Sequence, residues 1–226
     1  MCTKKEMKHF LKDAQTAADE ILSYEPFSRY ADKINFVAVM CPSIDTDVST
    51  PQDNSWKQTA INSNFMTFYS PRYLTTNSVH AIHDCLVGIA YEHLIILANT
   101  DTYGGGGIYN SYTLTTAHNP LFKPVVVHEF GHSLMGLGDE YIEIGNTVSA
   151  LYPAGKEPWE ANLTRFVDFN GKWEDLDVPQ DFSIPFKNQL DEFIKYLLQE
   201  VENHSIYVIG GQSKRGKEVT EEWIRS

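Results

Sequence analysis

The spacing of apolar residues along the chain predicts a mixture of helices and strands. Residues 4–24 carry apolar side chains at helical intervals, which predicts an amphipathic helix. The apolar runs at 34–40 and 93–99 are typical of buried core strands, and the pattern at 79–89 is helical. The remaining pattern predicts a polar, turn-rich loop at 41–56, short strands at 65–70 and 207–209, an alternating strand at 108–116, and a helix at about 185–203.

The order of these elements, with a further helix around residue 130, indicates an α/β or α+β fold with a sheet beneath that helix. The chain has 226 residues, of which 42% are hydrophobic and 12% aromatic. That is enough to bury the core of one large domain or of a domain with lobes. We therefore expect a single domain, and we find no internal repeat.

Charge and composition exclude several classes of function. The net charge is −12 and the basic residues form no cluster, so we expect no nucleic-acid partner. No apolar stretch has the length needed to span a membrane. The start of the chain is charged and periodic, unlike a signal peptide. Cys2, Cys41 and Cys85 show no CxxC spacing, and we interpret them as neither a disulfide framework nor a cysteine zinc cluster.

The segment HEFGHSLMGLGDEY, residues 128–141, has the spacing of a metal site. His128 and His132 lie on one face of a helix, so both can bind one metal ion. Glu129 projects beside them, where it can act on a water at the metal. A polar surface helix is the alternative. The metal site is favoured because buried histidines and carboxylates need partners, and one side of this helix is apolar. The apolar residues are Phe130, Leu134 and Leu137.

Residues after the second histidine can complete the ligand set. Gly136 is typical of a helix C-terminus, where a left-handed residue reverses the chain. Beyond this bend Asp139 can return as the third ligand, which leaves the fourth position open as in catalytic zinc sites. A thermolysin-like site is the alternative, in which the third ligand comes from a later helix. Glu157 and Glu160 are available for that role.

Four consecutive glycines, Gly104 to Gly107, precede the predicted strand at 108–116. Glycine lets the backbone approach a ligand closely or adopt positive φ. The run is therefore either a flexible turn before an edge strand or the rim of a cleft where a peptide adds as an extra strand, and both interpretations stay open. It is not a phosphate loop, because no GK[ST] follows.

Together with the histidine motif, several further stretches carry a family resemblance. In chain order they are YEPFSRYADKINFVAV, SNFMTFYSPRYLTT, NTDTYGGGGIYN, TTAHN and EPWEANLTRFVDFNGKW. The chain resembles the catalytic domain of the immunoglobulin A peptidases, the igalysin branch of the metzincin zinc metallopeptidases, over nearly its whole length. This resemblance implies a mixed twisted sheet with an active-site helix carrying HExxH. It also implies an N-terminal subdomain at 1–138 and a smaller C-terminal subdomain at 139–226, which we expect to be truncated.

The resemblance implies a zinc-dependent endopeptidase with one catalytic Zn²⁺ and a protein or peptide substrate. His128 and His132 match the family's histidine ligands, and Glu129 matches the general base that works with a metal-activated water. Asp139 keeps the third ligand's three-residue spacing from the glycine, although one residue is added before that glycine. Glu140 is the fallback for this ligand.

The resemblance also implies that substrate is held in an extended, antiparallel pose along the glycine-rich edge strand. The residues expected to bind it are Gly105, Gly106, Gly107, Ile108 and Tyr109. His118, within TTAHN, is expected to be a hydrogen-bonded loop histidine and not a ligand. Export to the cell surface or the medium and a monomeric state are further expectations.

One departure from the family concerns the floor of the metal site. Metzincins have a methionine in a turn beneath the metal, but no methionine follows Met135 here. Trp223 or Ile224 stands where it is expected, and Ile224 is taken as the structural substitute. This departure motivates a second hypothesis, a catalytically impaired zinc-binding module that binds protein or glycan partners.

Overall fold

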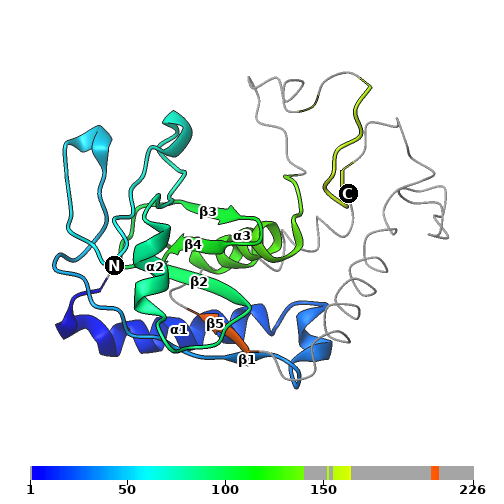
Figure 1. Ribbon diagram of the computed structural model, residues 1–226, viewed down its shortest axis with the longest axis horizontal. Coiled ribbons are helices and arrows are strands. Elements are labelled where there is room, and N and C mark those ends of the chain that lie inside the picture. Colours follow the sequence, from blue (N-terminus) through cyan, green and yellow to red (C-terminus); the bar gives the residue numbers. More distant parts are fainter. Residues whose placement is uncertain (1, 140–151, 153–154, 164–204, 209–226) are drawn as a thin grey trace.

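The computed structural model describes residues 2–139, 152, 155–163 and 205–208 (Figure 1). Most of the predicted C-terminal subdomain lies outside the described residues, as do the predicted helix at 185–203, Glu140, Trp223 and Ile224. The division of the chain into two subdomains therefore stays a prediction.

A five-stranded mixed sheet forms the centre of the described structure, with strand order β1-β5-β2-β4-β3. The strands β1, β5, β2 and β4 are parallel, and β3 pairs antiparallel with β4 at one edge. The central β2 is buried along its whole length, as a core strand in a parallel sheet requires. The bounds are Asn35–Phe36 for β1, His93–Ala98 for β2, Gly105–Ile108 for β3, Tyr112–Thr116 for β4 and Ser205–Val208 for β5.

Two long helices cover one face of this sheet (Figure 1). The helix α3, Phe122–Met135, packs on β3 and β4, while α1, Met7–Ile21, contacts α3, β2 and β5. The core lies between these layers and includes Phe130 of α3, which is fully buried against Phe27. Shorter helices are α2, Val79–Cys85, and the 3₁₀ helices η1 Lys4–Glu6, η2 Phe27–Tyr30, η3 Pro51–Asp53 and η4 Thr67–Tyr69.

The mixed α/β architecture confirms the coarse fold class, whereas the metzincin-like arrangement stays a prediction, and several elements match their predicted positions. The helix predicted at 4–24 is η1 followed by α1, and its buried side includes Phe10, Ala14 and Ile21. Leu11, expected on that side, is exposed. The strand predicted at 93–99 is β2, and the helix predicted at 79–89 is the shorter α2. No described helix is long and apolar enough to cross a membrane.

One predicted strand is much shorter and less buried than expected, and another is absent from the structure. Only Asn35 and Phe36 of the 34–40 run form a strand, and none of the run is buried, because β1 lies at the sheet's outer edge. The 65–70 segment is not a strand at all. It contains η4, and Met66, Phe68 and Tyr69 have positive φ. Its aromatic residues suggest a strand by propensity, but Phe68 and Tyr69 face solvent and have no sheet face to pack on.

The strand predicted at 108–116 is a hairpin instead. Its first arm, β3, begins inside the glycine run, and the chain turns at Asn110, which has a φ of 53°. The second arm is β4. Three of the four glycines, Gly105 to Gly107, thus belong to the edge strand itself, and the interpretation as a flexible turn before it is wrong. The reason is that the run pairs with β4 and packs on α3, which compensates for the poor strand propensity of glycine.

The interpretation of the cysteines also needs correction. Cys41 and Cys85 form a disulfide, with their Cα atoms 5.9 Å apart, and Cys2 is a buried free thiol. The paired cysteines are 44 residues apart in sequence. No local motif marks such a pair, because the fold alone brings the loop after β1 to the end of α2.

Candidate metal centre

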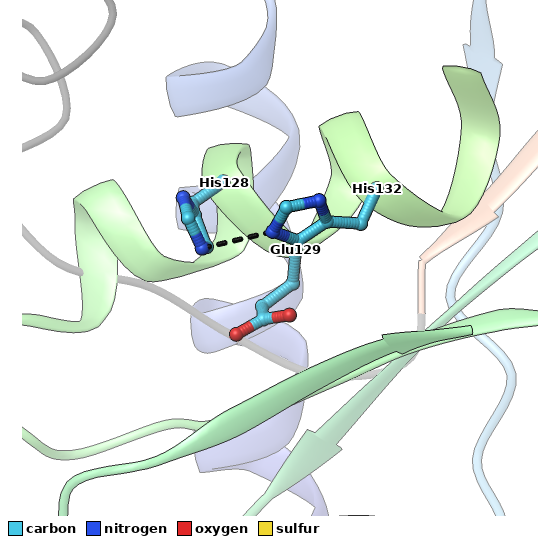
Figure 2. Close-up of side chains that lie close together, drawn as sticks. All are labelled: His128, Glu129 and His132. Atoms are coloured by element: carbon cyan, nitrogen blue, oxygen red, sulfur yellow. Dashed lines mark hydrogen bonds between the residues drawn. The ribbon is translucent and has the colours of Figure 1, made fainter. Parts of the chain in front are cut away.

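Two histidines of α3 turn their imidazole rings toward each other (Figure 2). Nε2 of His128 and Nε2 of His132 are 3.0 Å apart. Nδ1 of His132 lies 2.5 Å from the carbonyl oxygen of Leu137, to which it donates a hydrogen bond. In the neutral ring this bond leaves the lone pair on Nε2, the form in which histidine binds metals. Two such lone pairs facing each other require a cation or a proton between them.

Asp139 completes a triangle of donor atoms with the histidines. Its Oδ1 lies 3.2 Å from Nε2 of His128 and 3.2 Å from Nε2 of His132. Ligands about 2.0–2.1 Å from a tetrahedral zinc ion lie roughly 3.3 Å from one another. The three atoms therefore have the chemistry and spacing of three zinc ligands, with one position left open. The donor set fits the ion.

Glu160, a candidate third ligand in the thermolysin-like alternative, has a different partner. Its carboxylate accepts a hydrogen bond of 2.6 Å from the hydroxyl of Tyr152. Oδ1 of Asp139, by contrast, lies 3.2 Å from Nε2 of both histidines. This geometry favours Asp139 over Glu160 as the third ligand. Glu140 lies outside the described residues.

The electrostatics of the cluster follow from burial and opposite charges. Burial lowers the pKa of His132, but the hydrogen bond to Asp139 and the charge of Glu129 outweigh it and raise the pKa to about 9. Burial raises the pKa of Asp139, but its hydrogen bonds with both histidines hold that pKa far below the usual value. Burial raises the pKa of Glu129 more than the neighbouring histidines lower it. Glu129 is therefore easier to protonate than an exposed glutamate.

The glycine strand fixes how closely α3 can approach the sheet. A Cβ atom on Gly105 would lie 2.8 Å from Oε1 of Glu129. One on Gly107 would lie 2.3 Å from the backbone oxygen of Glu129 and 2.8 Å from Cβ of His132. The backbone of Gly107 lowers the pKa of the Glu129 carboxylate, against the larger effect of burial. Figure 2 shows this side chain directed from α3 toward the strand. Glycine here serves the close approach of the protein's own helix.

Comparison with known families agrees with this site. The sequence profile of the IgA peptidase M64 family matches residues 2–212. The chain belongs to the IgA peptidase M64 family. Members are metallopeptidases, so the protein is a peptidase, a hydrolase that acts on protein substrates, and the resemblance found in the sequence is confirmed. A search of curated proteins gave no significant match.

In this M64 chain, residues 155–163 hold the loop that carries Asp139. The side-chain amide of Asn162 accepts a hydrogen bond of 2.8 Å from the N–H of Gly138 and donates one of 2.7 Å to its carbonyl oxygen. Leu163 packs directly on Gly138. Asn162 is buried and both of its polar ends are used, so the backbone next to Asp139 is fixed. Sequence reasoning missed this residue, because only the family-like stretch EPWEANLTRFVDFNGKW pointed to the segment.

A buried polar chain anchors α3 to the sheet, and sequence reasoning missed it too. Nε2 of His93 on β2 lies 2.9 Å from Oγ of Ser133, which lies 2.5 Å from Oγ1 of Thr113 on β4. Burial lowers the pKa of His93 to about 4, so this histidine is neutral near pH 7. Ser133 is next to His132, so the chain fixes the rotation of the helix beneath the metal site. A histidine within an apolar strand was the only signal in the sequence.

The remaining sequence-predicted residues are placed as follows. Gly136 follows α3 with a φ of 64°, and its N–H donates to the carbonyl oxygen of His132. The predicted substrate-binding residues lie on and just after the edge strand β3, where Gly105 is bridged to Tyr73 while Ile108 and Tyr109 are exposed. His118 is hydrogen-bonded to Asp13 at 3.0 Å and lies in a loop, as expected.

Proposed function

We propose that this protein is a zinc-dependent endopeptidase. The observation that carries the proposal is the triangle of donor atoms from His128, His132 and Asp139, next to the carboxylate of Glu129. When bound, a zinc ion would acidify a water molecule and polarise the carbonyl group of the scissile peptide bond. The M64 membership of the chain supports this chemistry.

Glu129 is the proposed proton carrier. Its carboxylate lies among the two histidines and the β3 backbone, and burial raises its pKa. A carboxylate with a raised pKa accepts a proton from the attacking water more readily and can then deliver it to the leaving amine. His128, His132 and Asp139 have the complementary role of holding the ion, with His132 oriented by the Leu137 carbonyl.

The edge strand β3 is the proposed place of the substrate backbone. Gly105 uses the edge that faces away from β4 to bond with Arg72 and Leu74 of the neighbouring loop. Backbone groups in a strand alternate in direction, so Gly107 presents its groups to the same outer edge, beside Glu129. An extended peptide added there would bring a peptide bond to the catalytic carboxylate.

The disulfide supports the proposal that the protein works outside the reducing cytosol. Bonds such as Cys41–Cys85 persist in oxidising compartments and are rare in the cytosol. Mass spectrometry of the protein recovered from its natural host would test it. Reduced Cys41 and Cys85 would contradict export. The monomeric state stays a prediction, to be tested by light scattering.

Digestion of casein and of a quenched peptide library tests the function. We expect cleavage that a chelator abolishes and that stoichiometric zinc restores. Glu129→Gln should keep the metal and lose turnover. The control is Glu25→Gln, which changes a carboxylate paired with Arg29 and should leave cleavage intact. Cleavage by Glu129→Gln at the wild-type rate would refute the assignment. Full zinc binding without any cleavage would favour the non-catalytic binding module.

A further inference from the structure

Two exposed aromatic rings lie in contact beside the metal site. The rings of Tyr109 and Trp159 have their centroids 5.0 Å apart and are tilted by 41°. Tyr109 is 52% exposed and Trp159 is 58% exposed. A single exposed aromatic residue is ordinary, as Trp56 in a distant part of the sequence illustrates. Two that share a surface next to a candidate active site form a defined apolar patch, which we call the aromatic platform.

The platform is fixed to both halves of the site. A Cβ atom on Gly136 would lie 2.7 Å from the Trp159 ring and 2.9 Å from the Tyr109 ring, so both rings rest on the glycine that follows α3. Tyr109 also follows directly on the edge strand β3. Trp159 belongs to the segment in which Asn162 holds the backbone at Gly138. The platform is therefore held by packing contacts on both sides without being buried.

Only part of the surface of the Tyr109 and Trp159 rings is buried against Gly136. More than half of each side chain remains in water, whereas the aromatic pair Phe27–Phe130 in the core is almost completely buried. Large apolar surface left exposed at the end of a binding strand is typical of a ligand contact. Aromatic rings offer planar faces that favour other aromatic or large apolar side chains.

We propose that the aromatic platform is a substrate subsite for an aromatic or large aliphatic side chain on the amino-terminal side of the cleaved bond. The inference rests on the proposed peptidase function. A peptide antiparallel to β3 runs with its amino-terminal part toward Tyr109. The Glu129 carboxylate lies against Gly105 and is influenced by the backbone of Gly107, and Tyr109 is two residues beyond Gly107, roughly 7 Å along the strand. The platform thus contacts the residue about two or three positions before the scissile bond.

Cleavage-site mapping of a peptide library by mass spectrometry tests the proposal. The wild-type protein should prefer aromatic and large aliphatic residues two or three positions before the cut. Trp159→Ala should lose that preference, with kcat/KM for preferred peptides falling by up to about tenfold, mainly through KM. Trp159→Phe should keep the preference. Trp56→Ala, which removes an exposed tryptophan outside the site, should behave as wild type.

A binding measurement separates this proposal from the proposed function. Zinc-loaded Glu129→Gln is titrated, by fluorescence anisotropy, with two labelled peptides that differ by Phe or Ala at the preferred position. The affinity for the Phe peptide divided by that for the Ala peptide should approach one in the double variant that also carries Trp159→Ala. An unchanged ratio would overturn the subsite whether or not the wild-type protein cleaves. Loss of zinc with an unchanged ratio would show that Trp159 only covers Gly136.

Discussion

The two halves of the candidate metal centre are held in different ways. His128, Glu129 and His132 lie on one helix, whose distance from the sheet is set by glycines of β3 and whose rotation is set by buried contacts of Ser133. Asp139 lies on a loop that the Asn162 side chain fixes through two hydrogen bonds to Gly138. The helical half is organised by regular structure and close packing. The loop half depends on one buried amide.

Because of this difference, substitutions in the two halves should have different effects on fold stability and on metal affinity. Changes to the helical half disturb the fold and the metal together, because α3 is part of the core. Changes to the loop half should affect metal affinity with a smaller effect on the fold. Four tests, ordered from the largest expected effect to the smallest, distinguish the helical half from the loop half.

Removing a ligand from the helical half should have the largest effect. Structural zinc sites contribute roughly 10–16 kcal/mol in total, so losing one of three protein ligands costs several kcal/mol of binding free energy. We expect His132→Ala to bind no stoichiometric zinc after dialysis, by elemental analysis. Asp139→Asn should weaken zinc binding less, because a neutral amide oxygen can still reach the ion. Retention of one zinc per chain by His132→Ala would contradict the ligand assignment.

Adding one methyl group to the glycine strand should destabilise the fold. In Gly107→Ala the new Cβ meets backbone of α3, which cannot move aside, so we expect a loss of about 1–3 kcal/mol in the free energy of unfolding. Gly88→Ala is the control. Gly88 has a φ of 80° and no atom near its added Cβ, so this change costs only backbone strain, about 1 kcal/mol. Urea unfolding measures both. Equal losses would contradict the close-approach argument.

Replacing the buried amide should weaken the loop half alone. Asn162→Leu removes both hydrogen bonds to Gly138, and we expect zinc affinity to fall about 10- to 100-fold, in the range of other supporting contacts. Asn119→Leu is the matched control, because Asn119 also donates to a carbonyl oxygen, that of Asp101, and accepts from the N–H of Leu121. It should reduce stability without changing zinc affinity. Competition titration with a chelator measures the affinities.

The smallest expected effect is a pH dependence of the chelator-treated protein. The pKa of His132 is raised from its ordinary 6.5 to about 9, so its stabilisation is complete below pH 6.5 and is lost as the pH rises through 9. The pKa of Asp139 is lowered from 3.8, so its contribution is present above that pH and is lost as the pH falls. Thermal unfolding should therefore show highest stability between these limits. Asp139→Asn should flatten the decline toward pH 9.

The sequence was sufficient for the helical half of the site. The spacing of His128 and His132, with an apolar helix side, predicts two imidazoles on one packed face, and the structure has this arrangement. Gly136 was also recognisable as the end of the helix, because the left-handed backbone conformation that follows a helix favours glycine and depends only on local geometry. The regular core elements α1 and β2 were likewise visible in the hydrophobic pattern.

The contacts of the loop half were not accessible from the sequence. Asn162 meets Gly138 across a separation of 24 residues, and no local pattern encodes such a pair. The Cys41–Cys85 bond and the polar chain from His93 were missed for the same reason, because each joins segments about 40 residues apart in the sequence. The packing role of the glycines was not foreseen, because the sequence does not show that α3 lies this close to β3. Their predicted role at the rim of a substrate cleft stays a prediction.

Zinc-edge anomalous diffraction from crystals of the zinc-loaded protein tests the central claim most directly. We predict one strong peak per chain, about 2.0–2.2 Å from Nε2 of His128, Nε2 of His132 and a carboxylate oxygen of Asp139. A peak that lacked the Asp139 carboxylate, or no peak between the two histidines, would contradict the account.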